Sequence, residues 1–150
     1  MKPYAAPSDT SDPLGASSLT ARSVAALDRL EAHGDAEDLV SLYRPEAEVG
    51  SVAAVEVLRG PDGARRFWSQ YRARFGEMRT EYRSVVADSL TAALEWTTVA
   101  VVNDVTVRYD GVTVLGSDSD LVARSFAYFD TRPLAQSISG HPSSTTEDRT

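Results

Sequence analysis

The chain has 150 residues, 42% of them apolar, and its 15 basic and 22 acidic side chains give a formal net charge of −7. This length and composition fit one domain with a sizeable core. The acidic balance argues against nucleic acid or an anionic membrane as a partner. Cysteine is absent, which excludes disulfides, thiolate nucleophiles and cysteine-bound zinc.

Both ends of the chain are poor in large apolar side chains. Residues 1–17 and 135–150 consist mainly of Ser, Thr, Pro, Gly, Asp and Ala, and such segments bury too little apolar surface to offset their ordering entropy. We therefore predict two disordered tails around one domain at residues 18–134. No apolar run reaches the length of a membrane span and no secretion signal is visible, so the cytoplasm is the expected location.

Two helices are expected near the start of this domain. Ser18 can cap the first helix, which extends to about residue 32 and ends before Gly34. Asp35 can cap a second helix of about two turns, which Pro45 would stop.

The strongest periodic pattern is a third helix at residues 61–75, where aromatic side chains recur at helical spacing and arginines fall between them. After Gly76 the period changes from 3.6 to 2, which indicates strands with one buried face. The predicted strands are 46–58, 78–83, 92–102, 105–115 and 121–130. Helices followed by consecutive strands favour an α+β fold with a mainly antiparallel sheet.

Several short motifs occur in a characteristic order between residues 19 and 134. They are Gly34-Asp35, Leu42-Tyr43-Arg44-Pro45-Glu46-Ala47, Gly60, Phe67-Trp68, Leu94-Glu95-Trp96, Gly111-Val112-Thr113-Val114 and Tyr128-Phe129-Asp130. Together they resemble the nuclear transport factor 2-like superfamily, in particular its SnoaL-like polyketide cyclases and ketosteroid isomerases. The resemblance implies a cone-shaped, curved sheet with three helices that enclose one pocket, and homodimers built on the outer face of the sheet.

Strand alternation assigns side chains to the pocket, because neighbouring residues point to opposite faces of a sheet. Trp96 and Tyr109 face inward in this register. The predicted substrate-binding residues are Leu27, Ser51, Phe67, Trp68, Tyr82, Trp96, Thr113, Leu115, Ser125, Ala127 and Phe129. A pocket of this kind suits a flat, largely apolar small molecule. No metal-binding or nucleotide-binding motif is present, so neither a metal nor a cofactor is expected.

The resemblance also places the catalytic groups of the family on this chain, and they are replaced. The general base and the two oxyanion donors of ketosteroid isomerases fall on Ser51, Leu27 and Thr113, and the aspartate of SnoaL-like cyclases falls on Ala127.

Two residues remain as candidates for catalysis. Glu31 lies one helical turn after Leu27, and a carboxylate buried against aromatic rings would act as a general acid or base. The alternative is a solvated glutamate at a helix end. Tyr109 could donate a hydrogen bond to a carbonyl or epoxide oxygen, or it could be a packed core tyrosine.

These residues favour a cofactor-independent cyclase or related tailoring enzyme that acts on a polyketide or similar secondary metabolite. Ring closure, isomerisation and epoxide opening all remain open, because conformational restriction in a pocket supplies much of the rate of such reactions. The alternative is a non-catalytic small-molecule-binding or dimerisation module, which the replaced family positions would explain.

Overall fold

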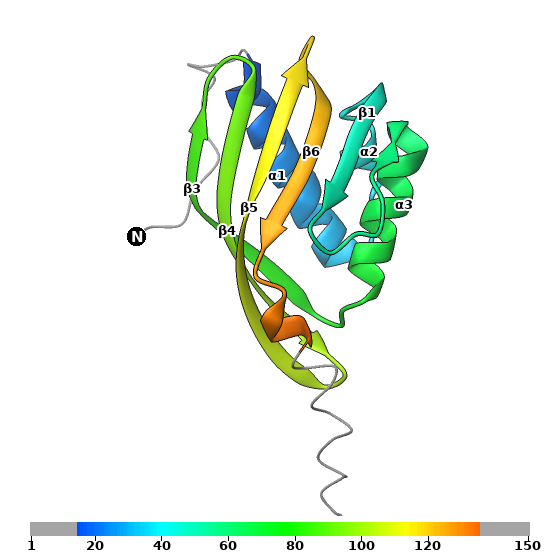
Figure 1. The fold of residues 1–150 in the computed structure, drawn as a ribbon, viewed down its shortest axis with the longest axis vertical. Helices are drawn as coiled ribbons and strands as arrows, with labels where there is room; N and C mark the ends of the chain where they lie inside the picture. Colours follow the sequence, from blue (N-terminus) through cyan, green and yellow to red (C-terminus); the bar gives the residue numbers. More distant parts are fainter. Residues whose placement is uncertain (1–14, 136–150) are drawn as a thin grey trace, which may run out of the picture.

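The fold is an open, curved sheet of six strands, seen in a computed structural model that describes residues 15–135 (Figure 1). The strand order is β2-β1-β6-β5-β4-β3. Strands β1 and β6 are parallel and every other neighbouring pair is antiparallel. The strands are β1 (Tyr43–Ser51), β2 (Leu58–Arg59), β3 (Met78–Ala87), β4 (Thr91–Val102), β5 (Val105–Asp118) and β6 (Leu121–Phe129). The predicted α+β class is confirmed, with a mixed sheet.

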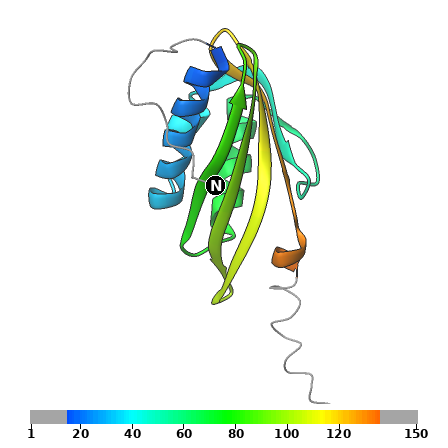
Figure 2. The same ribbon diagram turned by 90° about the vertical axis from the view of Figure 1, so that its left-hand side faces the viewer.

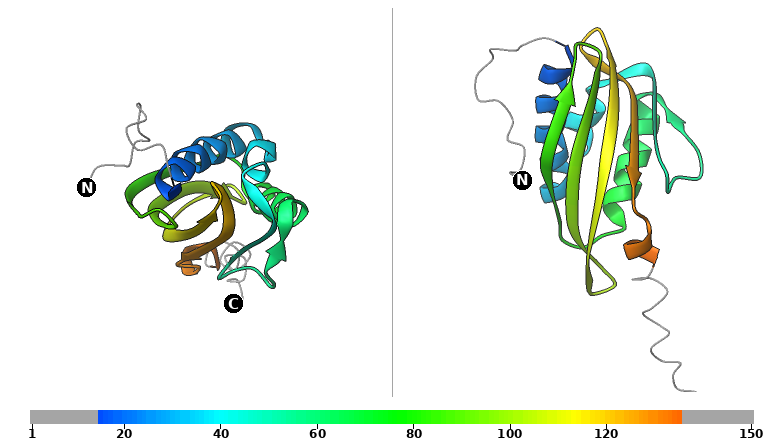
Figure 3. Two further views of the ribbon diagram at one scale, coloured as in Figure 1. Left: turned by 90° about the horizontal axis from the view of Figure 1, so that it is seen from above. Right: turned by 60° about the vertical axis from the view of Figure 1, so that its left-hand side comes forward.

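The helices before and between the strands are α1 (Gly15–His33), α2 (Glu37–Val40) and α3 (Gly60–Ala73), and a single helical turn at residues 132–135 follows β6 (Figure 1). Helices α1 and α3 close the open side of the curved sheet (Figures 2 and 3). Helix α1 begins three residues before Ser18, the predicted cap, and α3 begins one residue before Pro61. Both predicted tails lie almost wholly outside the described residues.

The second helix is shorter than the sequence pattern predicts. Asp35 does accept a hydrogen bond from the backbone N–H of Glu37, as a capping residue would (2.9 Å). The helix nevertheless ends at Val40, and Tyr43 begins β1. The expectation that Pro45 stops a helix is wrong: Pro45 lies inside β1, between the paired positions Tyr43 and Glu48, where the register shifts and no ladder hydrogen bond is required of it.

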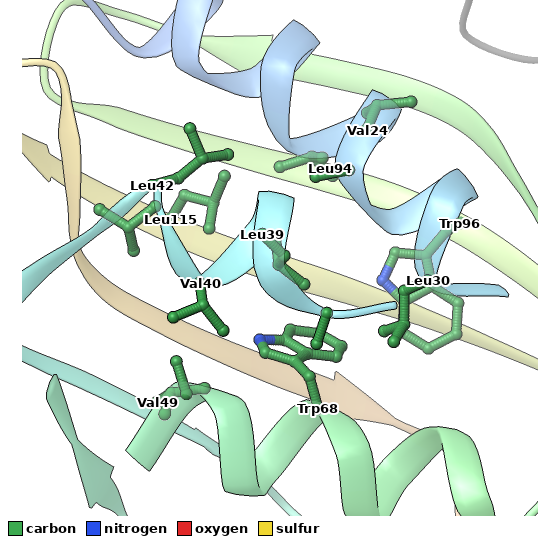
Figure 4. Packing of buried hydrophobic residues seen from close by; sticks show 14 of the residues in the cluster. Val24, Leu30, Leu39, Val40, Leu42, Val49, Trp68, Leu94, Trp96 and Leu115 are labelled. Carbon is green, nitrogen blue, oxygen red and sulfur yellow. The ribbon is translucent and has the colours of Figure 1, made fainter. Parts of the chain in front are cut away.

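The core fills the space between the helices and the concave face of the sheet (Figure 4). Leu30 of α1 and Leu39 of α2 are fully buried, as is Leu94 of β4. Trp68 of α3 lies among them, and its indole N–H donates to the Tyr43 hydroxyl over 3.0 Å. This hydrogen bond satisfies the one polar atom that the tryptophan brings into the core.

The turns that join the last three strands have a backbone conformation that suits the polar residues found there. Asn103 and Asp104 have φ values of 51° and 67°, and Ser119 and Asp120 have φ values of 57° and 65°. Two successive left-handed residues form the turn type whose twist suits a hairpin, and Asn and Asp tolerate that conformation better than most residues.

Helix α3 starts where Gly60 packs directly against β1. Gly60 has φ +72°, and a Cβ at this position would lie 2.6 Å from the carbonyl oxygen of Pro45. Gly34, which follows α1, has nearly the same φ of +73° but has nothing within 4 Å of a Cβ. Only glycine satisfies both constraints at position 60.

We therefore expect Gly60→Ala to destabilise the protein more than Gly34→Ala. Both variants incur the cost of a left-handed alanine, roughly 1–2 kcal/mol, and Gly60→Ala adds a steric overlap of roughly 1–3 kcal/mol. Urea denaturation of the two variants measures the difference in the free energy of unfolding. Equal losses would show that the backbone around Pro45 moves aside at no cost.

Candidate functional site

A cavity of about 50 Å³ lies between α1, α3 and the concave face of the sheet. Its walls include Leu27 of α1, Phe67 and Trp68 of α3, and Trp96 and Phe129 of the sheet. Every predicted site residue lines this cavity except Tyr109, Leu115 and Ser125.

Those three residues lie behind the cavity. Leu115 and Ser125 line an adjoining space of about 20 Å³, which shares Leu27, Trp68, Tyr82 and Thr113 with the cavity. Tyr109 faces inward, as strand alternation predicts, and is 2% exposed. Its ring packs edge-to-face on Trp96 at 5.8 Å between centroids, and its hydroxyl meets the Tyr71 hydroxyl at 2.5 Å. A catalytic role for Tyr109 stays a prediction.

Glu31 is the acidic residue of the cavity, and Thr80 holds its carboxylate. The backbone N–H of Thr80 donates to Oε1 over 2.9 Å, and the Thr80 hydroxyl donates to Oε2 over 2.5 Å. Burial raises the pKa of Glu31, while these two hydrogen bonds and Arg72 partly oppose the rise, and Asp28 adds to it. The side chain is therefore a fixed, partly desolvated carboxylate at the last turn of α1.

A chain of hydroxyl groups continues from Glu31 into the sheet and to α3. The Thr80 hydroxyl contacts the Thr98 hydroxyl at 2.7 Å, and the paired hydroxyls of Tyr71 and Tyr109 lie near Thr98. We call Glu31, Thr80, Thr98, Tyr71 and Tyr109 the hydroxyl chain. Because the Thr80 hydroxyl donates to Glu31, the Thr98 hydroxyl can donate to Thr80 in turn.

Tyr71, Thr80 and Thr98 line the cavity but were not among the predicted site residues. The sequence did carry a signal for them. Thr80 shares a face of β3 with Tyr82, and Thr98 lies two residues after the inward-facing Trp96. Tyr71 belongs to the aromatic stripe of α3. Strand alternation therefore places Thr80 and Thr98 facing inward, and helical spacing does the same for Tyr71, but neither pattern shows where their hydroxyl groups lie relative to one another.

Tyr82 presents a hydroxyl group with no partner in the described part of the chain. The residue is 6% exposed and lines the cavity, and its hydroxyl makes no hydrogen bond. Burial raises the pKa of Tyr82, and the nearby negative charge of Glu31 raises it further. Tyr82 is therefore a neutral donor, close to Glu31, that remains available to a bound molecule.

The aromatic walls of the cavity are held in place by polar contacts of their own. The indole N–H of Trp96 donates to the Thr113 hydroxyl over 2.9 Å. A Cβ at Gly111 would lie 2.6 Å from the Trp96 ring and 2.7 Å from Cβ of Phe129, so glycine lets the ring lie flat against β5. These contacts fix a flat apolar surface opposite Glu31 and Tyr82.

The outer face of the sheet carries a second group of aromatic residues. Phe126 and Tyr128 of β6 lie 4.8 Å apart between ring centroids, and Arg124 lies over the Phe126 ring at 5.1 Å. Tyr128 is 47% exposed. The homodimer predicted on this face stays a prediction.

Among residues 15–135, no helix is both long and apolar enough to cross a membrane.

Solved structures with the same architecture support the assignment of the fold. AclR from Streptomyces galilaeus, proposed to be a hydroxylase, is 17% identical, with a TM-score of 0.67 over 82% of this chain and 94% of that one. A proposed SnoaL-like polyketide cyclase from Jannaschia is 14% identical, with a TM-score of 0.67 over 79% and 92%. An epoxide hydrolase-like protein from M. tuberculosis is 15% identical, with a TM-score of 0.61 over 82% and 97%. These similarities define a nuclear transport factor 2-like fold.

The sequence itself identifies the family within this fold. The model of the SnoaL-like domain matches residues 22–125, which include most of α1 and extend into β6. The chain therefore belongs to the SnoaL-like domain family. Among the curated proteins, none matches the sequence.

The half-buried carboxylate of Glu31 gives stability a specific dependence on pH. Because the pKa of Glu31 is raised above 4.5 in the folded protein, the folded state binds this proton more tightly than the unfolded chain does. Ionised Glu31 thus lowers stability as the pH rises from about 4.5 through the folded-state pKa. We expect the stability of Glu31→Gln, relative to the unsubstituted protein, to increase across this range and level off above it.

Urea denaturation of both proteins between about pH 4 and about pH 8 measures this difference. The comparison cancels the titration of the other carboxylates, which the two proteins share. A difference that does not change with pH would show that burial leaves the pKa of Glu31 unaltered.

Proposed function

We propose that this protein is a cofactor-independent acid–base enzyme that closes or rearranges rings of a polyketide or similar secondary metabolite. The observation that carries the proposal is the pairing, in one largely apolar cavity, of a half-buried carboxylate, Glu31, with a hydroxyl donor, Tyr82, that has no hydrogen-bond partner among residues 15–135. One group can remove a proton from carbon, and the other can stabilise the oxygen that becomes negative as the proton leaves.

Glu31 has the properties required of the base. Its raised pKa makes it a stronger proton acceptor than a solvated carboxylate, and its two hydrogen bonds to Thr80 fix its orientation. A carboxylate held in this way does not have to be ordered when substrate binds. The hydroxyl chain behind it supplies dipoles that stabilise the ionised form before the reaction.

Tyr82 has the properties required of the donor. Its hydroxyl is protonated at neutral pH because burial and the charge of Glu31 both raise its pKa. No group among residues 15–135 forms a hydrogen bond with this hydroxyl, so a carbonyl oxygen that binds to it displaces no protein partner. Proton removal next to that carbonyl gives an enolate, and its oxygen accepts the hydrogen bond from Tyr82.

The shape of the cavity then selects the reaction that follows. An enolate carbon held between flat aromatic walls can attack a second carbonyl of the same molecule and close a ring, or it can take the proton back at another carbon and isomerise. The same two groups could open an epoxide: Glu31 takes a proton from a water molecule that attacks the ring carbon, and Tyr82 donates a proton to the oxygen of the breaking C–O bond. Proteins named as a polyketide cyclase and as an epoxide hydrolase share this fold.

The alternative function is a binding module without catalysis. Leu27, Ser51, Thr113 and Ala127 all line the cavity, and none of them carries the carboxylate or phenol that the family resemblance places there. A protein of this kind would bind the same flat ligands and leave them unchanged.

The test is enzyme-catalysed exchange of the α-protons of β-tetralone for deuterium, followed by proton NMR. Exchange of these protons requires a base to remove the proton and a hydrogen-bond donor to stabilise the enolate oxygen. We expect the unsubstituted protein to accelerate exchange, and Glu31→Gln and Tyr82→Phe each to lower the rate about 100-fold. Tyr128→Phe, a tyrosine on the outer face of the sheet, should leave the rate unchanged.

Two results would contradict the proposal. Exchange at the uncatalysed rate, with β-tetralone shown to bind by tryptophan fluorescence, would favour the binding module. Acceleration that persists in Glu31→Gln would show that another group removes the proton.

A further inference from the structure

An outer cleft of about 200 Å³ continues from the cavity to the surface. The cleft and the cavity share Ser51, Phe67, Tyr71 and Phe129, so they adjoin, and we call the two together the path. On one side of the cleft lies α3, which runs beside β1 (Figure 1). A ligand whose reacting part contacts Glu31 would therefore place the rest of its structure in the cleft.

The α3 side of the cleft carries a row of polar side chains. Arg66, Gln70 and Arg74 follow one another at intervals of four residues and therefore share one face of the helix. Phe67 and Tyr71, on the neighbouring face, point into the path. The Cα atoms of Arg66 and Arg74 lie about 12 Å apart along the helix axis. Their side chains are long and flexible, so both guanidinium groups can approach one group in the cleft.

Neither arginine has a partner of its own. Of the arginines between residues 15 and 135, only Arg66, Arg74 and Arg108 make no ion pair, no side-chain hydrogen bond and no ring contact. Two of these three lie in the cleft, although the chain as a whole is acidic, with a net charge of −7. The acidic residue of the cleft, Glu56, forms no ion pair with either of them.

We propose that Arg66 and Arg74 bind a carboxylate of the substrate, which is therefore a flat aromatic or polycyclic acid rather than a neutral molecule. The apolar end of this acid occupies the cavity between Trp96 and Phe67, and its carboxylate lies in the cleft. Guanidinium groups bind carboxylates through paired hydrogen bonds, and free arginines can do so without breaking an existing ion pair. This inference deepens the proposed function and rests on it for the orientation of the ligand.

The test compares the binding of β-naphthylacetate with that of its neutral amide, β-naphthylacetamide, followed by quenching of tryptophan fluorescence. We expect the unsubstituted protein to bind the acid about tenfold more tightly than the amide, the combined effect of two exposed charged pairs. The Arg66→Gln/Arg74→Gln double variant should bind both probes equally. Arg108→Gln, which removes an unpaired arginine from β5, should keep the preference.

Two further measurements separate the parts of the proposal. The preference for the acid should weaken between about 20 mM and about 300 mM salt, because the arginines are exposed. Ala127→Trp, which fills the cavity, should weaken the binding of both probes. If it weakens neither, the aromatic end lies elsewhere and the proposed orientation is wrong.

The outcomes also distinguish this inference from the proposed function. Equal affinities for acid and amide in the unsubstituted protein would overturn the carboxylate site, whatever the rate of β-tetralone exchange. An unchanged preference in the double variant would overturn it as well. If β-tetralone exchange is not catalysed but the preference depends on Arg66 and Arg74, the acid–base function fails and the carboxylate site stands.

Discussion

The half-buried carboxylate of Glu31 joins helix α1 to the sheet. Its two hydrogen bonds from Thr80 connect the last turn of α1 to β3, and Thr80 in turn contacts Thr98 of β4. Arg72 of α3 donates to the backbone carbonyl of Glu31 from the other side. The same residue therefore organises the packing of two helices and provides the chemistry of the cavity, so stability and activity are coupled at this position.

Much of the fold could be predicted from the sequence, because helical spacing and strand alternation are strong over most of the chain. The pattern failed where two principles competed. The spacing of apolar residues predicts that the second helix continues through Leu39, Val40 and Leu42. The chain instead forms a strand, because Tyr43 pairs with Val122 of β6. That pairing joins residues far apart in the sequence, so no local sequence pattern predicts it.

The residues that line the candidate site could be predicted from the sequence, but the hydrogen bonds between them could not. Alternation and helical spacing correctly placed Glu31 and Tyr82 at the cavity, because each depends on one periodic element. The choice between Tyr109 and Tyr82 as a free donor was not predictable. It depends on which hydroxyl meets Tyr71, a contact between β5 and α3 whose geometry only the folded chain defines. For the same reason, Thr80 and Thr98 read as ordinary strand residues.

The parallel pairing of β1 with β6 has a consequence for how the site is formed. Ser51 lies beside Ala127, and both residues line the cavity, yet half of the chain lies between them in sequence. Closing so long a loop is entropically costly and slow. During synthesis, the helices and the hairpins of β3, β4 and β5 emerge before β6. The cavity is therefore completed only when the last strand docks, and until then its aromatic walls are exposed to water.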